Sequence, residues 1–506
     1  MSPNKENSLT IGIAGSGIMG RGIAQLFLQA GHHIKLYDTD KAAGRAAGEF
    51  VFRMLQRLTE KGKLDKADLE QCKSRLSFCK RPDDLHDCNI VIEAVTENLK
   101  IKQELFARLE DIVAADTILA TNTSSLLISE IASACKQPQR VCGLHFFNPV
   151  PLMKVVEVIA GGKTADNCVT TLAELVGATG HRAVIAADQP GFLINHAGRA
   201  YYTEALKILE EGIADVVDID QVMREGMGFR MGPLELMDLT GLDVSARVMQ
   251  SIYDQFMQDA WYRPSSLLAP RLAAGLYGRK TGEGFYRYAD DQQLMPPQGR
   301  VPKGKLRDVW CSEQVTPALL QVLKNNGANI VTAADGEHTI NFLQFWGEDV
   351  SSAAATAGLD PSRCVAVDPL PDIGNRRTLM LSPVTRADCR DSAHALLAAD
   401  AVPVTVINDS PGFISQRILA MIVNVAANIA QRRIATVADL EDAVKLGLGY
   451  PYGPLAWGDK IGAARINNIL NTMHKLTQDS RYRSCIWLRR RAELALPLLT
   501  EEAARS

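Results

Sequence analysis

A glycine-rich turn near the start of the chain constrains its fold more than any other feature. The apolar run 9–14 precedes the pattern G-x-G-x-x-G, which reads Gly15-Ser16-Gly17-Ile18-Met19-Gly20. An apolar stretch with helical character follows and ends at Gly31, and a second apolar run, 34–37, ends in Asp38. The order of strand, glycine turn, helix and strand predicts a βαβ unit of a parallel sheet.

Each part of this unit suits a dinucleotide. Gly15 allows the tight turn, Gly17 lets the backbone approach a pyrophosphate, and Gly20 lets the helix pack closely on the sheet. Ile18 and Met19 open the helix, whose N-terminus attracts phosphate. Asp38 lies 38 − 15 = 23 residues after Gly15, close to the spacing of an acid that binds ribose hydroxyls. Such an acid repels a 2′-phosphate, so we expect NAD rather than NADP.

The sheet is predicted to continue to about residue 188. Strands are expected at 89–94 and 117–121, and helices at 99–113 and 166–178. We therefore predict a doubly wound α/β Rossmann domain over 8–188, with an inserted basic, amphipathic helical arm at 40–75. Two interpretations of the arm stay open: a solvated helix surface, or a contact for an anionic, phosphate-bearing substrate.

The stretch 143–158, GLHFFNPVPLMKVVEV, holds a His and a Glu twelve positions apart. His145 ends one strand-like run and Glu157 lies in the next, while Pro149 and Pro151 favour a turn between them. A carboxylate that binds one ring nitrogen orients an imidazole and makes it a better base. The alternative is a His in a loop and a Glu on a strand with no contact between them.

A polar run, TNTSS, ends the predicted strand 117–121. Polar residues at the carboxyl ends of parallel strands lie where ligands bind in this class of fold. Ser124 and Ser125 therefore point to a ligand site, although both residues are also common N-caps of a following helix.

The rest of the chain divides by pattern into three regions. Residues 189–290 are predicted to be a helical substrate or dimerisation domain, followed by a charged, Pro-rich linker at about 289–306. Residues 305–407 alternate helix and strand but lack the glycine pattern, which indicates a reduced Rossmann-like domain without a nucleotide site. Residues 408–500 are predicted to be a second all-α domain.

This second helical domain repeats the first. SPGFISQR at 410–417 matches QPGFLINH at 189–196, and a second match, 445–462 to 224–241, has the same offset of 221. A constant offset with Gly and Pro at the same breaks indicates duplication. Asn195 becomes Gln416 in the copy, and no His–Glu pair precedes it, so we expect the copy to keep the fold and lack the chemistry.

Composition narrows the class of partner and the compartment. The formal net charge of −3, from 55 basic and 58 acidic residues, does not support a nucleic-acid or anionic-membrane partner. The ten cysteines are scattered without C-x-x-C, which favours buried thiols over disulfides or zinc ligands. No apolar run is long enough to span a bilayer, and MSPNKENS is a short polar lead-in. We predict a cytoplasmic protein without a metal site.

Taken together, these motifs resemble the L-3-hydroxyacyl-CoA dehydrogenase family. The resemblance covers 8–290 through GSGIMGRGIAQ, IEAVTENLKIKQELF, TNTSSL, GLHFFNPVPLMKVVEV and GRKTGEGFYRY. The full length resembles the long bacterial 3-hydroxybutyryl-CoA branch, which includes the 3-hydroxyadipyl-CoA enzyme of phenylacetate breakdown. The resemblance implies NAD-dependent oxidation of an L-3-hydroxyacyl-CoA to a 3-ketoacyl-CoA, the chemistry of β-oxidation in fatty acid metabolism.

The resemblance also implies roles for single residues. His145 is the catalytic base, Glu157 is its partner, and Ser124 and Asn195 hold the substrate oxygen. The positions that line the NAD site are Glu97, Lys102, Asn148 and Lys280, and those that contact the CoA substrate are Lys61 and Ser124. Two positions depart from the family: Met54 stands where related proteins have a CoA-contacting serine, and His196 where an Arg is more usual.

The resemblance leaves the assembly and two alternative functions open. Short members of the family pair through their helical domains, so we expect a homodimer or an internal pseudo-dimer of 189–290 and 408–500. The alternatives are an NAD-dependent dehydrogenase of a free hydroxy acid and a non-catalytic NAD-binding structural protein.

Overall fold

The chain divides into two compact units in a computed structural model that describes residues 8–290, 292–296, 299–305, 307–500 and 502. The first unit comprises the chain up to His196 together with Ile429–Leu448, and the second comprises Ala197–Asn428 and the chain from Gly449 onward. Most of the polar lead-in and parts of the predicted linker lie outside the described residues. Among the described residues, no helix combines the length and apolar character that a membrane span requires.

The first unit is built on an eight-stranded sheet in the order β3-β2-β1-β4-β5-β6-β7-β8. All neighbouring strands are parallel except β6 and β7, which are antiparallel because one short loop joins them directly. The strands are β1 (Thr10–Ala14), β2 (His33–Tyr37), β3 (Leu76–Cys79), β4 (Ile90–Glu93), β5 (Ile118–Thr121), β6 (Val141–Phe146), β7 (Val155–Ala160) and β8 (Arg182–Ala187).

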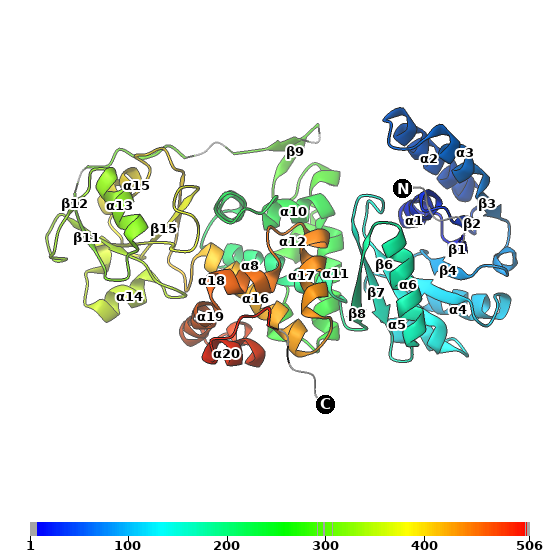
Figure 1. Ribbon diagram of the computed structural model, residues 1–506. Helices are drawn as coiled ribbons and strands as arrows, with labels where there is room; N and C mark the ends of the chain where they lie inside the picture. The colour runs from blue at the N-terminus through cyan, green and yellow to red at the C-terminus, as the bar shows by residue number, and fades with distance from the viewer. Residues whose placement is uncertain (1–7, 291, 297–298, 306, 501, 503–506) are drawn as a thin grey trace. The chain divides into compact units, whose positions relative to one another are not determined.

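Helices cover this sheet, and their buried faces form one core. Ile11, Phe27, Leu144 and Val158 belong to it and are fully buried. Two helices, α2 and α3, lie together as an arm beside β3 (Figure 1). The helices of this unit are α1 (Ile18–Gln29), α2 (Lys41–Glu60), α3 (Lys66–Ser74), α4 (Leu99–Ile112), α5 (Ile128–Ala132), α6 (Asp166–Ala178) and α17 (Val437–Leu448); α7 (Ile194–Ala197) begins in it.

The second unit contains most of the helical residues. Its helices are α8 (Arg199–Glu210), α9 (Val216–Gln221), α10 (Pro233–Thr240), α11 (Leu242–Gln255), α12 (Leu268–Ala273), α18 (Pro454–Ile461), α19 (Ala463–Thr477) and α20 (Ile486–Glu493); α16 (Ile414–Gln431) begins in it. A two-stranded antiparallel sheet of β9 (Arg287–Ala289) and β10 (Gln292–Leu294) overlaps the start of the predicted linker. The hydroxyl of Tyr288 anchors β9 by donating to Asp238 (3.0 Å), a long-range contact that composition does not reveal.

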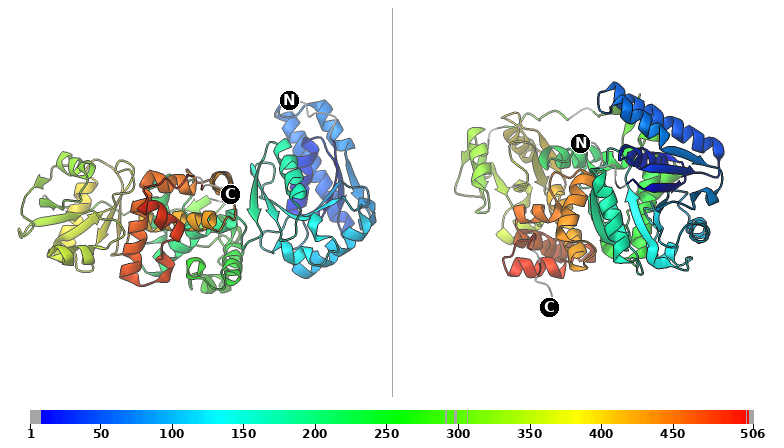
Figure 2. Two further views of the ribbon diagram at one scale, coloured as in Figure 1. Left: turned by 60° about the horizontal axis from the view of Figure 1, so that its bottom comes forward. Right: turned by 45° about the vertical axis from the view of Figure 1, so that its right-hand side comes forward.

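The second unit also holds a six-stranded sheet in the order β12-β11-β13-β14-β15-β16. Its last three strands repeat the pattern of β6, β7 and β8: one antiparallel pair followed by one parallel pair. Figure 2 shows this sheet and its helices in green and yellow from two further sides. The elements are β11 (Asp308–Cys311), β12 (Asn329–Ile330), β13 (Thr339–Leu343), β14 (Cys364–Val367), β15 (Arg377–Leu381), β16 (Val404–Ile407), α13 (Pro317–Asn325), α14 (Val350–Ala357) and α15 (Ala387–Leu397).

Candidate active site

The predicted contact between His145 and Glu157 is present. The antiparallel register of β6 and β7 places the two residues directly opposite one another. The ring nitrogen Nδ1 of His145 lies 2.5 Å from the carboxylate oxygen Oε2 of Glu157, and both side chains are buried. A neutral imidazole that donates from Nδ1 keeps its lone pair on Nε2. In that tautomer the pair presents a hydrogen-bond acceptor at Nε2.

A turn in the backbone holds the second oxygen of Glu157. Its Oε1 accepts hydrogen bonds from the backbone N–H groups of Leu193 (2.9 Å) and Ile194 (2.7 Å). The backbone reaches this position through two left-handed residues, Gly191 and Phe192, with φ of 73° and 50°. Both carboxylate oxygens are thus bound, which fixes the carboxylate and, through it, the plane of the imidazole.

Aromatic rings surround the imidazole. The ring centroid of Phe147 lies 4.4 Å from that of His145, and the centroid of Phe192 lies 5.9 Å away. These rings and the burial of His145 lower the local dielectric constant, which strengthens the electrostatic interaction of His145 with Glu157. Sequence reasoning missed Phe192; its neighbours in the PGF motif were the available signal.

The polar end of β5 folds around one carboxylate. Oε1 of Glu97 accepts from the Thr123 hydroxyl (2.6 Å) and from the N–H groups of Ser124 (2.9 Å) and Ser125 (3.1 Å). Burial opposes ionisation of Glu97, but Lys102 and these donors hold its pKa below the ordinary value. The alternative in which the serines cap a helix is wrong, since α5 begins at Ile128 and no side chain caps it.

Lys102 binds the carboxylate of Glu97, which holds this loop, and a second carboxylate. The side chain is buried, with Nζ 2.6 Å from an oxygen of Glu93 and 3.3 Å from Glu97. Glu93 also accepts from the hydroxyl of Thr121 (2.7 Å). Glu93, which Lys102 binds, therefore joins the ends of β4 and β5, and the contact of Lys102 with NAD stays a prediction. Sequence reasoning missed Glu93, although an acid at the end of a buried strand was a signal.

The glycine turn has the space that a dinucleotide needs. Gly15 has φ of 106°, and a Cβ on Gly20 would lie 1.8 Å from the carbonyl oxygen of Gly15, so the start of α1 packs tightly on the turn. A Cβ on Gly17 would meet nothing within 4 Å. Gly17 therefore leaves the backbone open at the helix N-terminus, where a pyrophosphate would be bound.

Asp38 stands at the end of β2 beside this turn. Its Oδ2 accepts from the N–H (2.8 Å) and hydroxyl (2.6 Å) of Ser16, and its Oδ1 accepts from the N–H of Asp40 (2.9 Å). Partial burial raises the pKa of Asp38, but these hydrogen bonds outweigh it and keep the carboxyl below its ordinary value. An ionised acid next to the pyrophosphate turn fits the ribose of NAD.

The remaining predicted residues lie in several elements. Asn195 follows Ile194 in α7, so it lies close to the residue that binds Glu157. Ser124 stays on the Glu97 loop, and Asn148 is exposed in the loop after β6. Lys61 is exposed directly after α2, and Lys280, in the second unit, pairs with Asp243 at 2.5 Å. The structure thus joins His145, Glu157 and the segment that carries Asn195.

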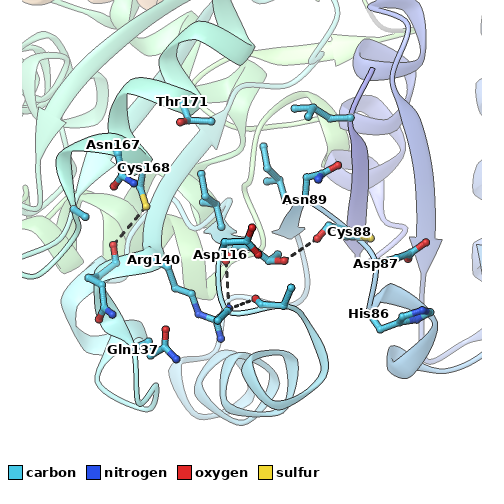
Figure 3. Close-up of a pocket in the computed structure, with 18 residues that line it drawn as sticks. His86, Asp87, Cys88, Asn89, Asp116, Gln137, Arg140, Asn167, Cys168 and Thr171 are labelled. Carbon is cyan, nitrogen blue, oxygen red and sulfur yellow. Dashed lines mark hydrogen bonds between the residues drawn. The ribbon is translucent and has the colours of Figure 1, made fainter. Parts of the chain in front are cut away.

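A separate cavity of about 490 Å³ lies at the other end of the same sheet (Figure 3). Its lining comes from residues that precede or begin β4, β5 and β6, together with Leu9 and the N-terminal part of α6, whereas the candidate site lies at the carboxyl ends of strands. Arg140 crosses it and donates to the carbonyl oxygens of Ala114 (2.6 Å) and Thr117 (3.4 Å) (Figure 3). Ligands of parallel sheets bind at carboxyl ends, so this cavity is not the dinucleotide site.

Comparison with known sequences assigns the family. The profile of the 3-hydroxyacyl-CoA dehydrogenase NAD binding domain matches residues 10–189, and that of the family's C-terminal domain matches 191–288 and 412–497. The chain therefore belongs to the 3-hydroxyacyl-CoA dehydrogenase family. It is an oxidoreductase that uses NAD to oxidise 3-hydroxyacyl-CoA, which confirms the prediction from the sequence motifs.

This chain is similar to relatives of its own length and to relatives of about half its length. The chain is 35% identical to 3-hydroxyadipyl-CoA dehydrogenase of Escherichia coli over 96% of this chain and 98% of the relative. It is 40% identical to a probable 3-hydroxybutyryl-CoA dehydrogenase of Bacillus subtilis, over 55% of this chain and 96% of the relative. A crystal structure of 3-hydroxybutyryl-CoA dehydrogenase from E. coli matches with a TM-score of 0.85 and 35% identity, covering 96% of this chain and 99% of that one.

Proposed function

We propose that His145 is the general base of the dehydrogenase and that Glu157 is its partner. The observation that carries the proposal is the buried pair in which Glu157 binds Nδ1 of His145 while two backbone N–H groups hold its other oxygen. Nε2 then takes the proton of the substrate's 3-hydroxyl group, and Glu157 stabilises the imidazolium that forms.

Four further residues are proposed to position substrate and cofactor. Ser124 and Asn195 hold the oxygen on C3, where charge shifts during the reaction. Gly17 and Asp38 bind the pyrophosphate and the ribose of NAD, and NAD supplies the hydride acceptor when it is bound. The open backbone at Gly17 and the ionised carboxyl of Asp38 support this part of the proposal. Contacts of Glu97, Lys102, Asn148 and Lys280 with NAD, and of Lys61 with CoA, stay predictions.

Substitution of His145 tests the role of the base. We expect His145→Gln to lower kcat at least about 10²-fold, because general base catalysis is typically worth 10²- to 10⁴-fold, and to leave NAD binding unchanged. Reduction of acetoacetyl-CoA by NADH measures kcat, and fluorescence titration with NADH measures binding. Glu157→Gln should lower kcat and alter the shape of the pH–rate profile.

A second histidine provides the control. His33 is exposed at the first residue of β2, at the opposite end of that strand from Asp38, and His33→Gln should keep both parameters. Retention of wild-type turnover by His145→Gln would refute the proposed base.

The acyl chain is proposed to be short or ω-carboxylated, with 3-hydroxybutyryl-CoA and 3-hydroxyadipyl-CoA as the candidates. Relatives of matching length carry both names, which supports this range but does not separate the two. A role in phenylacetate catabolism follows if the adipyl chain is preferred. Comparison of kcat/KM for acetoacetyl-CoA, longer 3-ketoacyl-CoAs and 3-oxoadipyl-CoA decides between them. The cytoplasmic location also stays a prediction.

The two helical regions are proposed to be duplicated domains that pair within one chain. Two residues related by the offset of 221, Phe229 and Tyr450, contact one another with ring centroids 4.9 Å apart. Residues that correspond to each other meet in this way when a two-fold axis runs between two copies. Asp238 and Asp459, also 221 apart, each accept hydrogen bonds from two consecutive backbone N–H groups.

A buried ion pair joins the same two regions. Arg417 of α16 donates to Glu204 of α8 (2.8 Å), and the hydroxyl of Tyr482 also donates to Glu204 (2.9 Å). Burial alone would lower the pKa of Arg417, but Tyr482, Glu204 and Glu211 together raise it above the ordinary value, so the guanidinium stays charged. These contacts support an internal pseudo-dimer, with the sheet of 305–407 as a reduced counterpart of the first.

A further inference from the structure

Strand β8 is the edge of the first sheet, and a segment from the second half of the chain covers it. The N–H of Ala187 donates to the carbonyl oxygen of Ile434 (2.7 Å). The guanidinium of Arg182 donates to Asp439 (2.7 Å) and to Asp442 (3.0 Å). The segment, residues 429–448, therefore belongs to the same compact unit as the catalytic pair.

Helix α17 packs its apolar face onto this edge. Leu440, Ala443 and Val444 are buried, and α17 lies against β7 and β8. Glu157 lies on β7, so the helix packs on the strand that carries it. Covering an edge strand also prevents unwanted pairing with other chains, which is the simplest reason for this packing.

The last turn of α17 reaches the residue that binds Glu157. A Cβ on Gly447 would lie 2.7 Å from the outer methyl Cδ1 of Ile194 and 3.2 Å from its Cγ2, distances that require the side chain of Ile194 to shift. The N–H of Ile194 is the donor 2.7 Å from Glu157. A continuous series of contacts therefore runs from Gly447 through Ile194 and Glu157 to His145.

We propose that residues 429–448 set the position of the catalytic pair, with Gly447 as the positioning residue. The inference rests on the proposed roles of His145 and Glu157. Because Gly447 has no side chain, α17 approaches closely enough to fix Ile194 against Glu157. The second half of the chain thus takes part in catalysis through its helix, although its own sheet lacks the pair.

The second unit contains a corresponding contact. The N–H of Asn408 donates to the carbonyl oxygen of Ile213 (2.9 Å), and both residues lie 221 positions from Ala187 and Ile434 respectively. A Cβ on Gly226, which corresponds to Gly447, would meet Pro371 at 3.4 Å, an ordinary contact distance. Each sheet is therefore bound by a helical segment from the other half of the chain. Only at the first sheet, which carries His145 and Glu157, does the glycine of that segment lie in a tight contact.

A substitution that overpacks the contact between α17 and Ile194 tests the proposal. We expect Gly447→Val to push Ile194 away from Glu157 and to lower kcat at least about tenfold, since a small misplacement of a catalytic group is costly. KM for NAD should stay within about twofold, because the glycine turn is not touched. Steady-state assays with acetoacetyl-CoA and NADH give both values.

A matched glycine variant controls for the effect of a bulky residue in a helix. Gly177 lies in α6, and its Cβ would meet nothing within 4 Å. Gly177→Val should therefore keep wild-type kcat. Ile194→Ala in the Gly447→Val background removes the atoms that clash, and we expect it to restore part of the lost kcat, which a general loss of stability would not do.

Hydrogen–deuterium exchange gives a second measurement that does not depend on Gly447. Arg182→Gln removes the two contacts with α17 and should speed amide exchange in the peptide that holds Leu193 and Ile194. Arg108→Gln, which removes an exposed pair with Asp83 at 3.8 Å, should not.

The outcomes separate this proposal from the proposed function. Activity in His145→Gln would overturn the proposed function. If His145→Gln is inactive while Gly447→Val keeps the kcat of Gly177→Val, or Arg182→Gln leaves the exchange of 193–194 unchanged, the positioning role of α17 is refuted on its own.

Discussion

The two sheets differ at the position that His145 holds in the first sheet. Asp188 accepts from the N–H groups of Ile128 and Ser129, and Asp409 accepts from those of Val350 and Ser351. With the two sheets aligned on these contacts and on their antiparallel strand pairs, Asp368 takes the place of His145. The carboxyl of Asp368 accepts from Gln416 (3.0 Å), which lies 221 positions after Asn195, and from Ser415. In the second sheet, the position that corresponds to His145 therefore holds a carboxyl whose two oxygens are both hydrogen-bonded within the protein.

The pKa of Asp368 leads to a prediction for stability. Full burial raises this pKa to about 6, against 3.8 for the unfolded chain, and bonds from Ser415 and Gln416 oppose the rise only in part. The folded protein therefore keeps a proton that the unfolded chain loses, so stability should fall as the pH rises from about 4 to 6 and level off above 6. The difference between the folded and unfolded pKa corresponds to about 3 kcal/mol in the free energy of unfolding.

Asp368→Asn should remove this part of the pH dependence, as measured by urea unfolding at pH 4.5, 6 and 7.5. The exposed Asp335 provides the comparison, because Asp335→Asn should leave the curve unchanged. Parallel stability curves for wild type and Asp368→Asn would contradict the prediction.

At the scale of helices, Arg417 connects α16 with α8. Arg417 and Glu204 are almost fully buried, so removing one partner leaves a buried charge without compensation. We expect Arg417→Met to lower the free energy of unfolding by about 3–5 kcal/mol, measured by chemical denaturation. Adding Glu204→Gln should recover part of the loss.

An exposed ion pair in α20 serves as the control for the stability change of Arg417→Met. Arg489 lies 3.4 Å from Glu493, and both are largely exposed, so Arg489→Met should cost less than about 1 kcal/mol. Equal losses for the two arginine variants would show that the buried pair does not hold the helical domains together.

At the scale of the whole molecule, the second half should replace a partner subunit. A chain truncated at Asp290 loses α17 and the contacts of Arg417, which exposes the edge of β8 and the buried Glu204. We expect this chain to lose activity as a monomer or to regain it only through concentration-dependent dimers. Light scattering together with kcat at several protein concentrations measures both. A fully active monomer of residues 1–290 would contradict the internal pseudo-dimer.

The sequence predicted most of the first sheet, because its signals are local. The predicted helix 166–178 agrees with α6 at both ends, and the glycine turn lies at the start of α1 as expected. The sequence could not decide whether Ser124 and Ser125 cap a helix. Their N–H groups donate instead to Glu97, which is more than 25 residues away in the chain. The pairing of β9 with β10 was missed because the anchor of β9, Asp238, is about 50 residues away.

The sequence by itself determined the family and the use of NAD, since motifs and strand pattern encode both locally, and it predicted the pairing of His145 with Glu157, which the antiparallel register of β6 and β7 then showed. Only the tertiary structure revealed that Leu193 and Ile194 hold the second oxygen of Glu157. It alone showed that Gly447, 253 residues beyond Ile194, packs against that donor. The physical reason is that burial and close approach depend on which distant segments meet, and no local pattern of residues records this.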